Sequence, residues 1–553
     1  MNDVGVLEAE RPERATARRA RVFLIIAIAL LLVKLFLVSR REMLPEEYDA
    51  SEYAQASLQD LAWIFAGSAS HPPGASLAIV LARSLGIPYR VFTEIFLAVA
   101  AFLFFRPLVA SMRLGIAAVT FSFGLLLFHP ALILELDRVM SDSVGFFCWL
   151  IGAGGIVGFV AAPREKFPGS SLGLVVAGFA FAGITRSGES VIVLFEMAAV
   201  TLSSIILFRG LDGWRRRRAV VACLFAVVAN YGATQALSAW HFVHAGYWGP
   251  TAVESREWWR LYSVLLSLPV ERNHRHGLVN KATMDMAESL SGDLGNMRDC
   301  LDEMAEGDRQ DPPNDVAAWR ITICLTENGT LKTSGKLSTI SSDILKGAQE
   351  NHFQLTAPIL GVIPQSAARW LSELPLSVVK LALEAVRIPD STRVTQGSWP
   401  PELFDQALLR RTALAAAGEN PEVTGYRSFI RILYKFLALL FWPAVLMSVL
   451  VSAAHLIQRP RITTTSDLIA FALFFMIIDV LCRISFYSIV DWILWDIPFR
   501  YILGVRVLTV VIVATLMTTW LAPAAVGALR PILVKLPSLP AWAENLGYRS
   551  RRA

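Results

Sequence analysis

The chain has 553 residues, of which 54% are hydrophobic and 18% charged, and its mean hydropathy is +0.50. This is more apolar surface than a water-soluble core would need to bury, so the composition indicates an integral membrane protein. The formal net charge of +5 is modest, and the basic residues occur in short blocks between apolar runs. That pattern is typical of topology signals and excludes an extended nucleic-acid-binding surface.

The first 21 residues are basic and precede an apolar run at 22–38. A secretory signal peptide would have a shorter apolar core and a small-residue cleavage site, whereas Ser39, Arg40 and Arg41 follow here. The sequence therefore predicts an uncleaved first span with its basic end in the cytoplasm.

Apolar runs long enough to be candidate membrane spans recur along the chain, since a span needs roughly 20 apolar residues. There are ten: 22–38, 91–110, 114–134, 143–162, 171–185, 190–208, 219–238, 429–456, 466–488 and 501–521. The run from Ala75 to Ile87 is shorter and contains Arg83, so we expect a helix on the membrane surface. If this run does not cross the membrane, every basic block lies on the same side as the N-terminus, as the positive-inside rule requires. If it crosses, the four arginines from Arg215 to Arg218 are translocated, which is costly, so the first alternative is favoured.

The predicted fold is an all-α polytopic membrane protein, a bundle of about ten transmembrane helices with interfacial helices and a large, mostly helical outer domain. The expected parts are a cytoplasmic N-terminus (1–21), a transmembrane catalytic module (22–238, with an outer loop at 40–90), an extracytoplasmic domain (239–428), C-terminal transmembrane helices (429–521) and a cytoplasmic tail (522–553). Residues 282–301 and 338–346 read as helical within the outer domain. A disulfide between Cys300 and Cys324 is plausible if that domain is exported.

The same topology places four segments on the outer side: residues 40–74, the turn at 135–142, the turn at 185–189, and residues 238–428. Acids and arginines without an evident structural role thus gather on one face of the membrane. We expect the functional site there.

Asp49 is a candidate general base, because a carboxylate on the outer loop near the lipid headgroups could take the proton of an acceptor hydroxyl. It also has capping-box spacing with Glu52, so it could simply cap a helix, and the two roles are compatible. Glu47 is a candidate substrate contact or part of a solvated rim. His71, held before Pro-Pro-Gly, is either a phosphate or sugar contact or a surface histidine without a role.

Asp137, Arg138 and Asp142 lie where one span ends and the next begins, and ionisable groups there are costly unless paired or hydrated. We interpret them as substrate-binding residues; the alternative is an ion pair within the turn. Arg186 lies between two spans and either binds a phosphate or extends to the lipid headgroups. Three further ionisable residues inside spans are expected to be paired packing residues: Lys34, Glu94 and Glu196.

The order of YDASEYAQASL, SHPPGASLAIVLARSLGIP, LFHPALILELDRVMSDS and GFAFAGITRSGES resembles the N-terminal half of bacterial polytopic glycosyltransferases with the GT-C fold. Such enzymes take sugars from polyprenyl-phosphate carriers, and the likeness covers roughly residues 20–240. It implies a base role for Asp49, a second acid at Asp137 or Asp142, and a carrier-phosphate contact for Arg186.

The sequence departs from this family pattern after Asp49 and after Arg186. Ala50 follows Asp49 where a second acid is expected, which weakens any metal requirement. Ser187 and Gly188 follow Arg186 where acids are expected, which leaves Glu189 as a substitute substrate contact.

The resemblance, together with the predicted topology, implies an inverting membrane glycosyltransferase in the inner (plasma) membrane, with its active site facing the periplasm. It would use a polyprenyl-phosphate-linked sugar and a glycan, lipid or protein acceptor, without nucleic acid and without a cofactor. A divalent metal is possible but no pattern supports one, since His274 and His276 have no clear third ligand. The alternatives are a transporter or flippase of lipid-linked glycans, disfavoured because few ionisable groups lie deep in the spans, and a non-catalytic assembly subunit.

Overall fold

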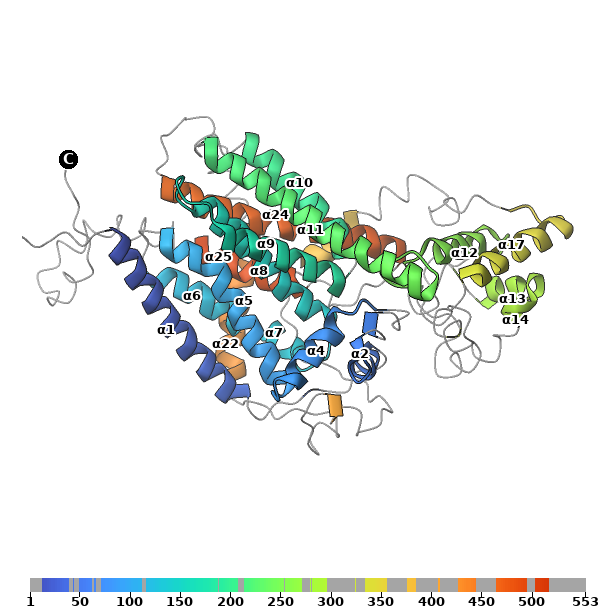
Figure 1. The fold of residues 1–553 in the computed structure, drawn as a ribbon, viewed down its shortest axis with the longest axis horizontal. Helices are drawn as coiled ribbons and strands as arrows, with labels where there is room; N and C mark the ends of the chain where they lie inside the picture. The colour runs from blue at the N-terminus through green and yellow to red at the C-terminus, as the bar shows by residue number, and fades with distance from the viewer. Residues whose placement is uncertain are drawn as a thin grey trace, which may run out of the picture.

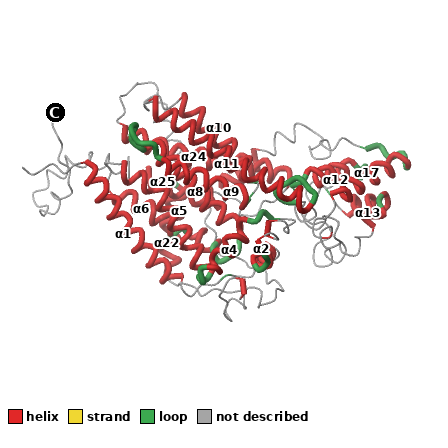
Figure 2. The backbone as a smooth tube through the Cα atoms, viewed as in Figure 1, coloured by secondary structure: helices red, strands yellow, loops and turns green. Residues whose placement is uncertain are grey.

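The protein is described here from a computed structural model, in which every described element is a helix or a loop (Figure 2). This confirms the predicted all-α fold class. The structure describes residues 12–38, 43, 49–61, 64–65, 71–111, 116–186, 188–206, 213–252, 254–270, 279, 281–295, 324, 334–355, 375–383, 406–407, 426–443, 464–494 and 503–516.

An apolar helix lies at each of the ten predicted spans. These helices are α1 (Pro12–Val38), α5 (Tyr89–Ser111), α6 with α7 (Ile116–Leu127 and Pro130–Glu135), α8 (Ser141–Ala161), α9 (Gly169–Thr185), α10 (Glu189–Ile206), α11 (Gly213–Ala245), α22 (Tyr426–Leu439), α24 (Thr464–Leu494) and α25 (Leu503–Leu516). By length and composition, six of the described spans can cross a membrane, and shorter apolar helices account for the others. The chain is a polytopic membrane protein.

The third predicted span is interrupted before its end. Pro130 lacks an N–H group and its ring would clash with the preceding turn, so α6 ends at Leu127 and α7 starts at Pro130. His129 caps the new helix, its Nδ1 accepting a hydrogen bond of 3.2 Å from the Ala131 N–H group.

Helix α8 is the centre of the bundle and packs against α5, α9 and α11 (Figure 1). Glycines along α8 permit this close packing. A Cβ on Gly178 of α9 would lie 2.4 Å from the Gly152 nitrogen, and one on Gly154 would lie 2.7 Å from the Leu103 oxygen of α5. Small residues at such positions let membrane helices approach closely enough for extensive van der Waals contact.

The two ends of the bundle differ in their polar contacts. Near one end Lys34, close to the end of α1, forms an ion pair with Glu94, close to the start of α5. The two helices are therefore antiparallel, and the segment that connects them begins and ends at this end of the bundle. At the opposite end Arg218 donates hydrogen bonds to carbonyl oxygens of the α8–α9 loop, including Ala162 at 2.8 Å and Lys166 at 2.7 Å. The four-arginine run and this basic loop therefore share one end.

Helix α4 (Gly74–Ser84) lies in the segment between α1 and α5. It packs against α2 (Asp49–Ser57), α5, α8 and α9. Its Leu81 and, just beyond its last turn, Leu85 are exposed by 51% and 58%, as expected for side chains that face lipid at a membrane surface. With 11 residues it is about 16 Å long, too short to cross a bilayer.

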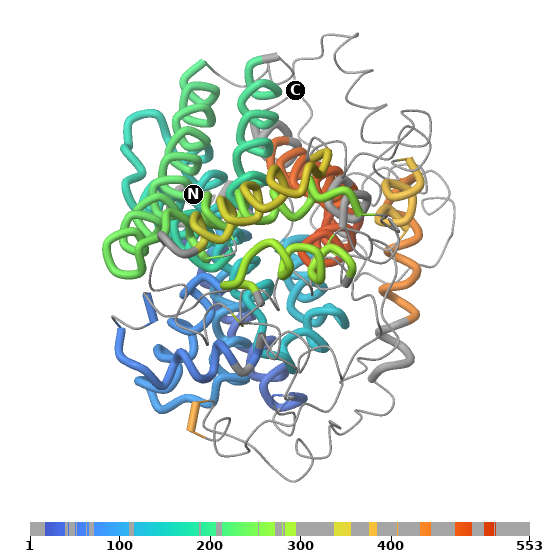
Figure 3. The backbone as a smooth tube through the Cα atoms, turned by 90° about the vertical axis from the view of Figure 1, so that its right-hand side faces the viewer, coloured from blue at the N-terminus to red at the C-terminus, as the bar shows by residue number. Residues whose placement is uncertain are grey.

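The segment after α11 forms a second unit with its own apolar core. Helix α11 has 33 residues and continues past residue 238, and at about 50 Å it is longer than the hydrocarbon layer is thick. Helices α12 (Arg256–Ser267), α13 (Lys281–Leu290), α14 (Gly292–Gly295) and α17 (Ser334–Glu350) follow, and Figure 3 views the bundle from their end. These helices cover much of the stretches that the sequence predicts as helical.

The cysteines differ between the two units. Cys324 contributes to the core of the second unit and is disulfide-bonded, whereas Cys148, Cys223 and Cys482 are free. The fifth cysteine, Cys300, lies outside the described residues.

Candidate functional site

The strap formed by His71, Pro72, Pro73 and Gly74 lies directly against the end of α9. A Cβ on Gly74 would overlap Thr185, at 2.6 Å from the Thr185 Cα atom, so this approach requires glycine. Arg186 follows Thr185 immediately. The contact therefore brings the predicted outer loop next to the predicted phosphate-binding arginine.

One buried hydrophobic cluster joins the segments that the sequence places on the outer side. Its members come from α2, α4, the turn before α8, the start of α8 and the end of α9, and they include Ala50, Tyr53, Ala75, Ile79, Val139, Val144 and Ala182. Several of them are chain neighbours of the candidate polar residues. The candidate residues from separate turns thus lie at one end of the bundle.

Asp142 and Arg186 form an ion pair at this end. Asp142 lies in the first turn of α8, where the positive end of the helix dipole favours a carboxylate. The Asp142 side chain is 6% exposed and that of Arg186 is 17% exposed, so the carboxylate is buried and the guanidinium is the part of the pair that can be reached from outside the bundle. The Arg186 guanidinium lies 5.8 Å from the ring centroid of Tyr487, which brings α24 into the site.

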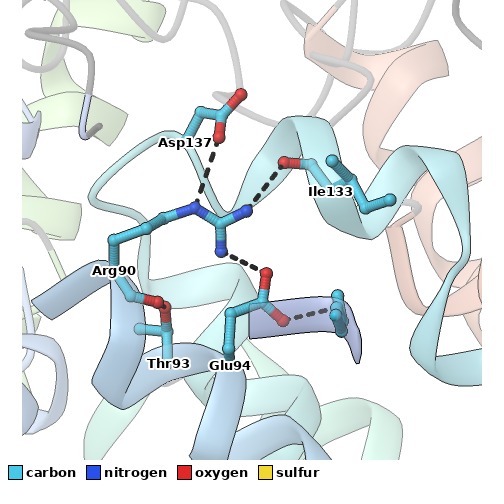
Figure 4. A network of polar contacts seen from close by, with 6 residues as sticks. Arg90, Thr93, Glu94, Ile133 and Asp137 are labelled. Atoms are coloured by element: carbon cyan, nitrogen blue, oxygen red, sulfur yellow. Dashed lines mark hydrogen bonds and ion pairs between the residues drawn. The ribbon is translucent and has the colours of Figure 1, made fainter. Parts of the chain in front are cut away.

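Asp137 belongs to a second, deeper network (Figure 4). The Arg90 Nε atom is 3.3 Å from Asp137, and its Nη1 atom donates to Glu94 at 2.5 Å. Glu94 also pairs with Lys34 at 2.5 Å. The four side chains are at most 3% exposed and carry two positive and two negative charges, so the network is electrically balanced.

This network gives Asp137 a partner from another helix. The alternatives at the sequence level were a substrate contact or a pair with its neighbour Arg138, whereas the structure pairs Asp137 with Arg90. Arg90 also reaches the Ile133 carbonyl at 3.5 Å, so it ties α7 and the following turn to α5. Arg138 itself is partly buried in that turn.

His71 pairs with Glu52, for which the sequence suggests only a capping role. Its Nε2 atom is 3.5 Å from Glu52 Oε2, and its ring centroid is 4.8 Å from that of Tyr53. The imidazole is therefore held against α2, one helical turn from Asp49, which begins that helix. A carboxylate beside a histidine fixes the orientation of the ring.

Three other candidates, Asp49, Glu189 and Glu47, lie wholly or in part outside the described residues. The side chains of Asp49 and Glu189, which begin α2 and α10, and all of Glu47 lie outside the described parts of the chain. His274 and His276 also fall outside them.

The bundle contains buried polar residues that the sequence does not single out, and one, Glu196, that it predicts only as a packing residue. On α24, Arg483 Nε lies 2.9 Å from both carboxylate oxygens of Asp479, and Glu196 of α10 accepts a hydrogen bond of 3.1 Å from Trp149. Arg506 of α25 is buried as well. The interior of the bundle is thus richer in ionisable groups than we expected, which weakens the argument against a transporter.

Comparisons with known proteins give little further identification. No protein-family model and no curated protein matches the chain. Similar solved structures include ArnT from Cupriavidus metallidurans in the apo state and bound to undecaprenyl phosphate, each 14% identical, with TM-scores of 0.31 and 0.30. These alignments cover 94% of this chain and 80% and 81% of the ArnT chain. Similarity at this level defines neither a family nor an activity for this chain.

Proposed function

We propose that the chain is a membrane glycosyltransferase of the GT-C type, which transfers a sugar from a polyprenyl-phosphate-linked donor to an acceptor hydroxyl. The observation that carries the proposal is the Asp142–Arg186 ion pair, partly exposed beside the strap that ends at Gly74. It combines a cation for a phosphate with nearby acids at the ends of membrane helices. A lipid-linked donor would present its phosphate at this level of the membrane.

Arg186 is the proposed phosphate contact. A guanidinium has five N–H donors in a planar fork, enough to bind a carboxylate and a phosphate at once. Asp142 and the Tyr487 ring orient it, so it would meet the donor with little loss of side-chain freedom. As the bond between the anomeric carbon and the phosphate oxygen breaks, Arg186 would stabilise the charge that develops on the departing phosphate.

Asp49 is the proposed general base. It would take the proton of the acceptor hydroxyl as that oxygen forms a bond to the anomeric carbon, opposite the leaving phosphate. The products are then the glycosylated acceptor, with inverted anomeric configuration, and the polyprenyl phosphate. His71, held by Glu52 near this helix, would be a second contact for the phosphate or the sugar.

We place this site on the extracytoplasmic side of the inner membrane. Support comes from the four-arginine run of α11, whose Arg218 is anchored at the other end of the bundle, since positive residues favour the cytoplasm. The disulfide of Cys324 in the second unit also favours an oxidising compartment.

The test is glycan profiling of a strain that lacks the protein, complemented with wild-type or variant chains. Arg186→Gln should reduce transfer on the order of 10²-fold, as for removal of one transition-state contact, and Asp49→Asn should abolish it. Arg164→Gln, on the exposed loop at the opposite end, is the matched control and should transfer normally. Normal glycans in the Arg186 and Asp49 variants, with normal membrane insertion, would refute the proposal.

A second candidate function is transport of a lipid-linked glycan, favoured by the buried Asp479–Arg483 pair inside α24. Purified chain in vesicles separates the two: net movement of the lipid without a covalent product supports transport, and formation of a glycosidic bond supports the transferase.

A further inference from the structure

Helix α12 carries an exposed tryptophan between two arginines. Arg256, Trp259 and Arg260 are all exposed, Trp259 by 53%. Positions 256, 259 and 260 of a helix fall within an arc of about 100°, so the three side chains share one face. We call these three residues the α12 patch.

A tight joint fixes the start of helix α12, and with it the α12 patch, against the end of α11. His241, in the last turns of α11, shares a hydrogen bond of 2.8 Å with the Gly249 carbonyl oxygen. A Cβ on Gly249 would lie 2.8 Å from the Ser255 Cα atom, and Ser255 caps α12 through the Trp258 N–H group. The patch therefore lies near the end of α11 that is opposite its four arginines.

Helix α12 does not lie in the membrane as an amphipathic surface helix would. Such a helix buries its apolar face in lipid. The apolar face of α12, which includes Trp258, Leu261 and Leu265, is instead buried in the core of the second unit, and α12 packs against α13 and α17. The face that remains for a ligand is the polar one.

The Trp259 ring is fixed in orientation. It meets the Trp258 ring edge to face, with centroids 5.4 Å apart and planes at 89°, and the Tyr262 ring at 6.0 Å and 85°. Two such contacts restrict rotation of the indole and leave it as a rigid exposed platform. Rigid aromatic faces bind the C–H faces of sugar rings at low entropic cost.

The charge of the α12 patch selects the kind of sugar. Neither Arg256 nor Arg260 forms an ion pair within the part of the chain that the structure describes. Guanidinium groups bind carboxylates and phosphates through paired hydrogen bonds. We propose that the α12 patch binds an anionic saccharide, with its ring on Trp259 and its carboxylate or phosphate between the two arginines.

Binding at the α12 patch does not depend on the proposed transferase activity; only the further step, that the saccharide is the acceptor, rests on it. The experiment uses the full chain in nanodiscs of zwitterionic lipid. The probes are trigalacturonate and glucose 6-phosphate, with maltotriose as the neutral comparison, and binding is measured by calorimetry and saturation-transfer NMR.

At least one anionic probe should bind more tightly than maltotriose, and Trp259→Ala should weaken that binding by about tenfold or more. The double variant Arg256→Gln with Arg260→Gln should remove the preference for the anionic probe. Trp248→Ala, an exposed tryptophan near the end of α11, is the matched control and should bind like wild type. Binding should also survive Arg186→Gln, which separates this proposal from failure of the transferase.

Two results would overturn the proposal. One is that neither anionic probe binds better than maltotriose, or that the α12 variants bind as wild type does. The other is that phosphatidylglycerol in the nanodisc displaces the probe in a Trp259-dependent manner, which would make the α12 patch a lipid headgroup site.

Discussion

Replacing Glu94 with leucine should destabilise the membrane bundle by about 3–5 kcal/mol, because it leaves buried cations without their shared partner. Glu94 lies 2.5 Å from both Lys34 and Arg90. Without it the network of Figure 4 keeps two cations and one acid, Asp137, in a region where these side chains are at most 3% exposed. An uncompensated charge cannot be solvated there, so the folded state carries the whole cost.

The structure also predicts how to rescue this variant. Combining Glu94→Leu with Lys34→Met removes one charge of each sign and leaves the Arg90–Asp137 pair in place. Exchange of a buried ion pair for apolar residues of similar volume is often neutral, so the double variant should recover most of the lost stability. Lys34→Met alone should cost less than Glu94→Leu, because Glu94 keeps its contact with Arg90.

The assay is the free energy of unfolding in one detergent, measured for each single and the double variant as a thermodynamic cycle. A control is the exposed pair of Lys346 and Glu350, which are 3.8 Å apart and have the i, i+4 spacing of Arg90 and Glu94. Removing that pair should change stability by less than about 1 kcal/mol. The reasoning fails if Glu94→Leu is as stable as wild type, or if adding Lys34→Met to it restores nothing.

The remaining predictions concern three other contacts. Gly74→Ala should lower the free energy of unfolding by about 1–3 kcal/mol and reduce transfer, because the strap must move away from Thr185. Gly173→Ala, whose new Cβ would have nothing within 4 Å, should be neutral or stabilising, and thermal unfolding compares the two variants. Arg218→Ala should open the α8–α9 loop to proteinase K in inside-out vesicles, and exposed Arg217→Ala should not. Cys324→Ser should lower stability by about 2–4 kcal/mol, to the level of reduced wild type, measured by unfolding with and without reductant.

The number and type of the elements could be predicted because membrane helices are encoded locally. Each predicted span rests on a continuous apolar run, and no distant residue is needed to recognise one. Pairing of Lys34 and Glu94 could also be expected from the sequence, since two opposite charges buried in membrane spans have few alternatives to an ion pair. The break before Pro130 was missed because hydropathy alone does not register the lost N–H group.

The choice of partners within the site could not be predicted in the same way. Arg90 contacts Asp137 across 47 positions of sequence, and Arg186 lies over Tyr487 across about 300, so both contacts depend on the rotation of packed helices. Some pairs within one helix could be found from the sequence, because opposite charges four residues apart lie on the same helix face. This spacing holds for Arg90 with Glu94 and for Asp479 with Arg483. Which neighbouring helix each pair faces is not contained in that spacing.

Asp137 and Asp142 are equivalent in the sequence, two acids in one turn, and the structure separates their roles. Asp137 is wholly buried in a balanced network, so any substrate would have to displace Arg90 to reach it. Asp142 holds Arg186 at an accessible position, where a phosphate can share the guanidinium without exposing an unpaired charge in the interior. The deeper network therefore fixes the turn, and the outer pair is the one that the proposed mechanism uses. It follows that Asp137→Asn should act mainly on stability, whereas Asp142→Asn should act mainly on transfer.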